Sequence, residues 1–259
     1  NYVSYSAAYD TYAKNVSGGI GLIAMHDQQG QGTIQTSMIG GVYSYNLKVS
    51  RKFSLMFGAR AAYYQKFLDW DKLTFGDMID PRRGFIYQTG DVIRGNGRHG
   101  FFDASAGMVG FTKNFYFGIA GHHLNRPDES MILGESRLPI RITGHMGATI
   151  KIGQRGRYSS NTMLMPNIIY QYQNGFQEFN IGAYLKYESF TIGAWYRNRD
   201  AFIVSLGLTT DKFRIGYSYD LTVSQLGGIT GGSHEISMGI NLKCKKTIKD
   251  FRRISCPSF

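Results

Sequence analysis

A two-residue alternation of apolar and polar side chains recurs from one end of this chain to the other. The stretch FSLMFGARAAYYQK places Phe53, Leu55, Phe57, Ala59, Ala61 and Tyr63 on one face and Ser54, Gly58 and Arg60 on the other. Successive side chains of a β-strand point to opposite faces, so this pattern predicts strands. We count roughly thirteen such segments, near residues 2–9, 17–26, 34–48, 53–66, 101–111, 115–124, 140–152, 159–172, 177–187, 189–197, 202–209, 212–221 and 234–243.

The composition agrees with an all-β fold. The chain has 18 Tyr, 17 Phe and 33 Gly, but only 5 Pro, and charged residues make up 18%. Aromatic residues favour strands, and glycines supply the many turns that a sheet of short connections needs. No run of 18 apolar residues is present, so the sequence predicts no transmembrane helix.

The connections between the predicted strands are mostly short and long in alternation. Short turns fall near 49–52, 112–114, 153–158, 188 and 210–211, and the longer links are 67–100, 125–139 and 222–233. Outer-membrane barrels have short periplasmic turns and longer extracellular loops, and their strands are about ten residues long. We therefore predict a transmembrane antiparallel up-and-down β-barrel over residues 1–243, with a long extracellular loop at about 67–100. The first residues already alternate, so we expect one strand to precede them, which makes about 14 strands with both termini in the periplasm.

The alternative is a soluble β-sandwich or propeller, which also alternates. A soluble protein of this size would place charges on its second face. Here one face is strongly aromatic and the other is small and rich in glycine, as in TIGAWYRN and RIGYSYDL. A closed sheet satisfies every backbone N–H and C=O in hydrocarbon without leaving an edge, which favours the barrel.

A basic tail follows the last predicted strand. The chain has a formal net charge of +11, and its positive residues are scattered except in the tail, which holds Lys245, Lys246, Lys249, Arg252 and Arg253. No RNA-binding or helix-turn-helix signature accompanies them, so nucleic acid is not an expected partner. We expect residues 244–259 to form a periplasmic tail that binds an acidic periplasmic protein, lipid phosphate or cell wall, or folds back into the barrel mouth.

The tail also holds both cysteines of the chain, Cys244 and Cys256. The periplasm permits disulfides, so a bridge between them is a candidate. It would close a small loop, and it requires Cα atoms within about 7 Å of each other.

The 67–100 loop is the strongest candidate for binding a partner. Its aromatic and arginine residues are Trp70, Phe75, Arg82, Arg83, Phe85 and Tyr87. Exposed aromatics with arginines are typical of protein interfaces. The alternative is a loop that folds over or into the barrel and packs its own aromatics. Asp77 and Asp80 lack the ligand density of a calcium loop.

No catalytic, metal or cofactor site is expected. His234, with Ser233 and Glu235, is the nearest approach to a catalytic cluster, but adjacent strand residues face apart. His122 and His123 fall on a predicted strand and would also point to opposite faces. No His or Cys pair has the spacing of a metal site.

A passive porin for small solutes is the other functional class left open. A barrel of about 14 strands can enclose water. The inward arginines Arg60, Arg197 and Arg214 would then line the lumen and favour anions. Alternatively they pair with the inward acids Glu178, Glu235 or Asp220, or the 67–100 loop plugs the lumen.

Several motifs resemble the PorP/SprF family of outer-membrane proteins of the type IX secretion system and gliding motility. They are GGIGLIAMHDQQGQG, YYQKFLDWDKLTFGDMIDPRRGF, KNFYFGIAGHHLNRPDES, RNRDAFIVSLG, FRIGYSYDLTVSQL, GGSHEISMGINLKC and FRRISCPSF. They keep their order and cover essentially the whole chain. The family's typical N-terminal Asp-Pro-rich stretch and first strand are absent here.

The resemblance implies a non-enzymatic barrel without cofactors in the outer membrane of a Gram-negative bacterium. Some family members partner a large secreted adhesin or surface protein and hold it at the cell surface by recognising its C-terminal domain. Others associate with secretion machinery or periplasmic components that reach the cell wall. The expected partners are therefore a secreted surface protein, type IX secretion components or periplasmic proteins, and outer-membrane lipid or lipopolysaccharide.

Overall fold

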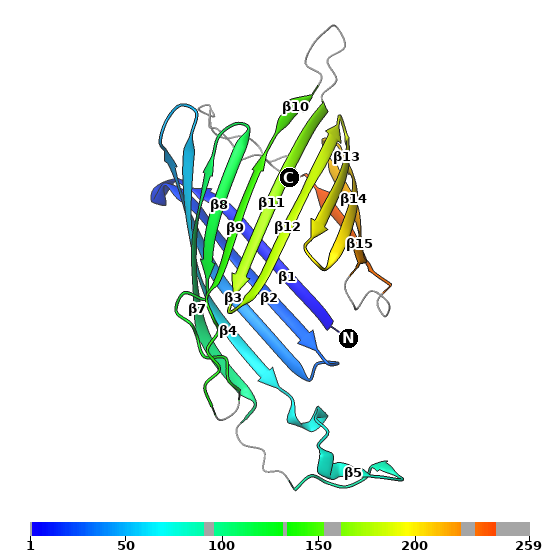
Figure 1. Ribbon diagram of the computed structural model, residues 1–259. Helices are drawn as coiled ribbons and strands as arrows, with labels where there is room; N and C mark the ends of the chain where they lie inside the picture. The colour runs from blue at the N-terminus through cyan, green and yellow to red at the C-terminus, as the bar shows by residue number, and fades with distance from the viewer. Residues whose placement is uncertain (1, 91–95, 132–133, 153–161, 224–230, 242–259) are drawn as a thin grey trace. The chain divides into compact units, whose positions relative to one another are not determined.

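The protein is built almost entirely of β-strands, as its computed structural model shows for residues 2–90, 96–131, 134–152, 162–223 and 231–241 (Figure 1). The long strands are β1 (Tyr2–Ala13), β2 (Gly18–Gln29), β3 (Ile34–Lys48), β4 (Ser54–Leu68), β7 (Arg98–Phe111), β8 (Phe115–His122), β9 (Arg141–Ala148), β11 (Thr162–Gln173), β12 (Phe176–Tyr187), β13 (Phe190–Arg197), β14 (Ala201–Thr209), β15 (Phe213–Thr222) and β16 (Ser233–Ile240). The short elements are the strands β5 (Ile79–Asp80), β6 (Gly84–Phe85) and β10 (Ile150–Ile152) and the 3₁₀ turns η1 (Lys14–Val16), η2 (Trp70–Lys72) and η3 (Gly76–Met78).

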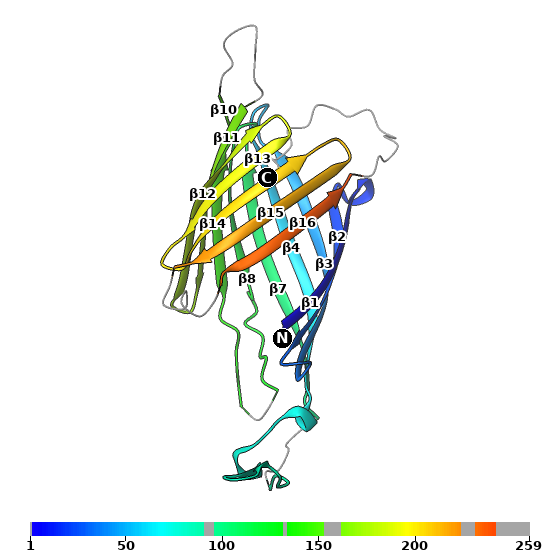
Figure 2. The same ribbon diagram turned by 90° about the vertical axis from the view of Figure 1, so that its right-hand side faces the viewer.

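The long strands form one antiparallel up-and-down sheet in chain order. Its hydrogen-bonded path runs from β1 to β16, with β10 paired to β11 beside that path, and β5 and β6 form a separate hairpin. Figure 2 shows β12 to β16 as successive neighbours. Each of the predicted segments corresponds to one strand except 140–152, which contains β9 and β10, so the predicted all-β, antiparallel up-and-down fold is confirmed. Among the described residues, β1 and β16 each have one neighbour, β2 and β15.

The described chain divides into two compact units. The first comprises residues 1–45, 57–107 and 121–140, and the second comprises residues 46–56, 108–120 and those from 141 onward. The first unit contains the β1–β2 hairpin, the β5–β6 hairpin and the link after β8. The second contains the strands β8 to β16 except the last residues of β8.

The strand register gives the second unit one apolar and one polar face. Val204 of β14 lies opposite Tyr219 of β15, and Leu206 lies opposite Tyr217. The intervening pair is Ser205 with Ser218. Side chains on these strands therefore alternate as the sequence predicts, with large apolar groups on one face and small or polar groups on the other.

Two strands are interrupted where the sequence predicts continuity. β8 ends at His122 rather than near residue 124, because His123 adopts a left-handed conformation with φ of 57°. The predicted strand 140–152 is broken at Thr149, whose N–H donates to the carbonyl of Asn114 (2.7 Å). No helix of the described part of the chain is long and apolar enough to cross a membrane.

Candidate functional site

The β5–β6 hairpin in the 67–100 loop is organised around the carboxylate of Asp80. Its Oδ1 accepts the backbone N–H groups of Arg82 and Arg83, both at 2.9 Å, and its Oδ2 accepts the Tyr87 hydroxyl at 3.1 Å. The pKa of Asp80 is lowered, chiefly by the Arg82 N–H bond; burial opposes this as the second-largest effect, and the Arg83 N–H and Tyr87 hydroxyl lower the pKa further. Gly84, with φ of 77°, completes the turn in a conformation that glycine adopts without strain.

The hairpin displays aromatic and cationic side chains to solvent. Phe85 is 58% exposed and Tyr87 is 52% exposed, and Arg82 and Arg83 are exposed beside them. No ion pair holds either arginine within the described residues. Ile86, also exposed, adds to the apolar part of this surface. We call residues Arg82, Arg83, Phe85, Ile86 and Tyr87 the hairpin surface.

The base of the same loop is attached to the link between β2 and β3. The Asp69 N–H donates to the carbonyl of Thr33 (2.8 Å), and Lys72 Nζ donates to the carbonyl of Gln31 (3.2 Å). Trp70 and Phe75 lie in this base and are half-buried. Of the six residues predicted in the loop, four therefore lie together on the exposed hairpin and two lie at its base.

A second feature of the first unit is a fully buried carboxylate on β7 that the sequence analysis did not single out. The Asp103 side chain has no exposed surface; it accepts Arg60 Nη2 at 3.0 Å and His123 Nδ1 at 2.7 Å. The same Arg60 nitrogen also donates to the Ser105 hydroxyl at 3.3 Å. The sequence did contain a signal for this residue: Asp103 is a single acid on a face of β7 that otherwise carries small and aromatic side chains.

The link after β8 is held against β7 by Asn125. Its amide nitrogen donates to the carbonyl of Phe102 (2.7 Å), and its amide oxygen accepts the N–H of Ala104 (3.0 Å). The Leu124 N–H bonds the Ala104 carbonyl (2.9 Å). The left-handed turn at His123 thus directs its imidazole to Asp103, a contact that strict alternation from His122 would not produce.

A second acid-centred turn follows in the same link. Asp128 Oδ1 accepts the N–H groups of Ser136 (2.8 Å) and Ser130 (3.1 Å), which lower the pKa of Asp128. His99 of β7 contacts the carbonyl of Asp128, and Lys66 of β4 forms an ion pair with Glu129. These contacts attach Asp128 to β7 and Glu129 to β4.

Arg197, on the polar face of the second unit, is paired with two acids. Arg197 Nη1 donates to Asp220 at 3.2 Å and to Asp200 at 3.1 Å. The sequence leaves two possibilities for Arg197, an open lumen lined by arginines or pairing with an inward acid such as Asp220. Arg197 forms the pair with Asp220. Arg60, in contrast, pairs with Asp103 rather than with any of the acids named from the sequence.

His234 and Glu235, which come nearest to a catalytic cluster in the sequence, lie on opposite faces of β16. His234 Nδ1 bonds the Tyr217 hydroxyl at 2.8 Å, whereas Glu235 accepts the Ser218 hydroxyl at 3.4 Å. The two side chains therefore point apart, as adjacent strand residues do. Within the described residues, no group of three or more His, Cys, Asp or Glu could hold a metal ion.

The tail candidates lie outside the described residues. They are Lys245, Lys246, Lys249, Arg252 and Arg253, and the cysteines Cys244 and Cys256. Their roles, and the bridge between the cysteines, stay predictions.

Comparison with known proteins assigns the family. The model of the family described as type IX secretion system membrane protein PorP/SprF matches residues 1–240. No curated protein and no solved structure matches the chain. The match covers nearly the whole sheet, from β1 to the end of β16. The chain therefore belongs to the PorP/SprF family and is an outer-membrane protein associated with type IX secretion.

Proposed function

We propose that this protein is a non-enzymatic outer-membrane scaffold that binds a secreted, adhesin-like surface protein through the hairpin surface of its 67–100 loop. The basic tail over residues 244–259 faces the periplasm and contacts secretion machinery or periplasmic proteins. The observation that carries the proposal is the hairpin, which combines exposed aromatic rings with two arginines on a turn held by Asp80.

The chemistry of the hairpin surface suits a protein partner. Phe85 and Tyr87 offer large apolar areas, and an arginine fork can bind a carboxylate with two hydrogen bonds. The loop is attached at its base, so the hairpin loses less freedom on binding than an unstructured loop of the same length would. We infer that the partner surface is acidic and contains a shallow apolar pocket.

The orientation follows from the lengths of the links. The links 67–100, 123–140 and 223–232 join strand ends on the same side of an up-and-down sheet, and longer links are extracellular in outer-membrane barrels. On this reasoning we infer that the hairpin lies outside the cell and that β16 ends on the periplasmic side.

The direct test is extraction of the native complex in mild detergent, followed by mass spectrometry of the proteins that co-purify. We expect a large surface protein in stoichiometric amount with the unmodified chain. Phe85→Ala and the double variant Arg82→Ala/Arg83→Ala should each reduce its recovery, since hot-spot side chains contribute about 2 kcal/mol or more.

The matched control is Phe176→Ala, which removes an aromatic ring that is 64% exposed beside the link 174–175. Recovery of the surface protein should not change with this variant. Equal loss with both phenylalanine variants would remove the hairpin from the proposal. A barrel that purifies alone and conducts ions in a planar bilayer would contradict the scaffold and support the porin.

A further inference from the structure

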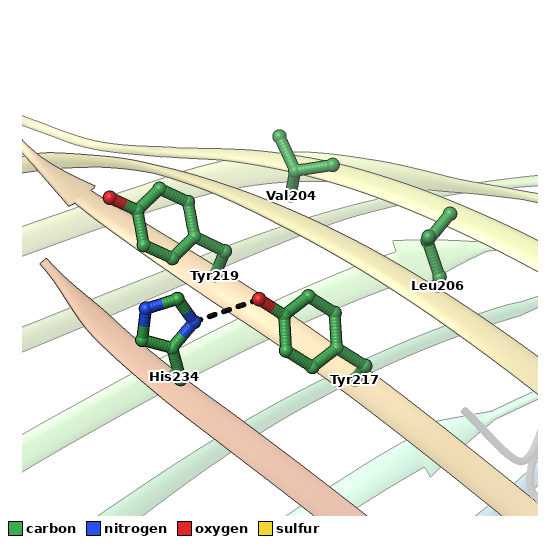
Figure 3. A pocket seen from close by; sticks show the side chains of 5 residues that line it. All are labelled: Val204, Leu206, Tyr217, Tyr219 and His234. Atoms are coloured by element: carbon green, nitrogen blue, oxygen red, sulfur yellow. Dashed lines mark hydrogen bonds between the residues drawn. The ribbon is translucent and has the colours of Figure 1, made fainter.

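The apolar face of β14 to β16 contains an open hollow near the strand ends that lead into the longer links. It is lined by Val204 and Leu206 of β14, Tyr217 and Tyr219 of β15, and His234 of β16 (Figure 3). Its volume of about 390 Å³ lies within the range of small-ligand sites, about 300–1,000 Å³. The hollow belongs to the face that carries exposed apolar residues and that an outer-membrane strand turns towards lipid.

The strand register explains why the surface is hollow there. Val204 lies opposite Ala194 of β13 on one side and opposite Tyr219 on the other, and Tyr219 lies opposite His234. The small side chains of Ala194 and Val204 therefore lie beside the large ring of Tyr219. The tyrosine and histidine rings form a wall, with centroids of Tyr219 and His234 4.7 Å apart.

The wall holds polar ring atoms at an otherwise apolar site. The Tyr217 hydroxyl, when it donates to His234 Nδ1, leaves the proton of the imidazole on Nε2. Within the described residues Nε2 has no partner. The Tyr219 hydroxyl donates to the carbonyl of Gly231 (3.0 Å) and keeps lone pairs free to accept.

An unpaired cation lies at the same end of the sheet. Arg199, in the link between β13 and β14, is exposed and forms no ion pair within the described residues. Its backbone N–H donates to the Tyr196 hydroxyl (3.3 Å), and the Tyr196 ring packs on Phe202 with centroids 4.9 Å apart. Phe202 precedes Val204 by two residues on the same face of β14, and Arg199 lies in the link at that end of the strand.

We propose that this hollow is a binding site for the lipid A part of lipopolysaccharide. One acyl chain lies along Val204 and Leu206, and a phosphate on the sugar accepts from His234 Nε2 and from the Arg199 guanidinium. An apolar floor with donors and a positive charge at one end matches an amphipathic anionic lipid. The choice of an outer-leaflet lipid rests on the extracellular orientation proposed for the longer links, but not on the binding of any secreted protein.

The test uses the full chain, delipidated in mild detergent and titrated with purified lipid A, with bound molecules counted by native mass spectrometry. We expect one lipid A to bind more tightly than the rest. Val204→Trp, which fills the hollow, should weaken that site by about tenfold or more, and Arg199→Ala/His234→Ala should weaken it by a similar factor. Leu208→Trp adds the same ring to the same face of β14 outside the lining and should leave the site unchanged.

Phosphatidylethanolamine, titrated in parallel, distinguishes a lipid A site from general coating by lipid. Equal binding of both lipids, or equal loss with Val204→Trp and Leu208→Trp, would overturn the proposal. Every variant is first checked for the gel-mobility shift on heating that marks a folded barrel. If Val204→Trp does not fold, Leu206→Phe takes its place, and an unchanged lipid A affinity in that variant would also overturn the proposal. The recovery of a surface protein with the hairpin variants is a separate readout, so either proposal can fail alone.

Discussion

The side chain of Asp103 on β7 is buried, whereas the two residues beside it are more exposed. It is 1% exposed between Phe102, which is 72% exposed, and Ala104. A buried carboxylate is tolerated only when donors replace water, and Arg60 and His123 supply them. One side chain thereby joins β4, β7 and the link after β8.

Asp103→Ala is expected to destabilise the folded protein by about 3–5 kcal/mol, because Arg60 and His123 would lose their shared acceptor in a buried site. The measurement is urea unfolding of the protein refolded into lipid vesicles, followed by tryptophan fluorescence. Asp200→Ala is the matched control, since it also removes an aspartate paired with an arginine but at a carboxylate that is 46% exposed. We expect about 0–1 kcal/mol there. Equal effects would mean that the buried pair contributes no more than a surface pair.

At the scale of elements, the hairpin β5–β6 depends on one ionised acid. Its two-residue strands pair only Ile79 with Phe85 and Asp80 with Gly84. The Asp80 carboxylate adds three hydrogen bonds to this small ladder. Because the folded pKa of Asp80 is lowered, its contribution is present above the ordinary value of 3.8 and is lost as the pH falls through the lowered folded pKa.

Hydrogen exchange at the Arg82 and Arg83 amides should therefore show protection at neutral pH that disappears in acid below pH 3.8, relative to an unstructured peptide at each pH. Asp80→Ala should abolish the protection at neutral pH. Asp71→Ala removes an equal charge from the same loop and should preserve it. Protection that persists in the Asp80→Ala variant would show that the backbone ladder alone holds the hairpin.

At the scale of the whole molecule, the proposed topology assigns the two candidate interaction regions to opposite sides of the outer membrane. The hairpin surface lies in the link after β4, and residues 244–259 follow β16 in the sequence. A scaffold of this kind can hold a surface protein and a periplasmic protein at once. The basic cluster in the tail suits an acidic partner.

Removal of residues 244–259 should eliminate a periplasmic partner from the co-purified set and retain the surface protein, while Phe85→Ala should do the reverse. Mass spectrometry of the two preparations gives the comparison. Replacing Lys245, Lys246, Lys249, Arg252 and Arg253 by Gln tests the charge alone, and Cys244→Ser/Cys256→Ser tests the bridge alone. If the truncated chain retains every partner, the tail has no binding role.

The site was predictable only in part. Composition and spacing singled out Arg82, Arg83, Phe85 and Tyr87, because an aromatic and arginine cluster around a Pro-Gly turn is a local feature. Trp70 and Phe75 are half-buried in the base of the loop, which Asp69 and Lys72 attach to residues 31–33, and no local pattern predicts that attachment. The partner of Arg60 was missed because Asp103 is 43 residues away and no local pattern links the two.

The sequence by itself determined the strands, since each side chain's preference for lipid or polar surroundings alternates along the backbone with the two-residue period of a strand. It also determined much of the up-and-down order, because a short turn leaves the two strands that it joins no closer partner than each other. Only the tertiary structure decided how His123 turns back to Asp103, and which residues of β13 to β16 stand side by side around the hollow. The physical reason is that register and backbone turns bring together side chains that are distant along the chain, and alternation carries no information about that pairing.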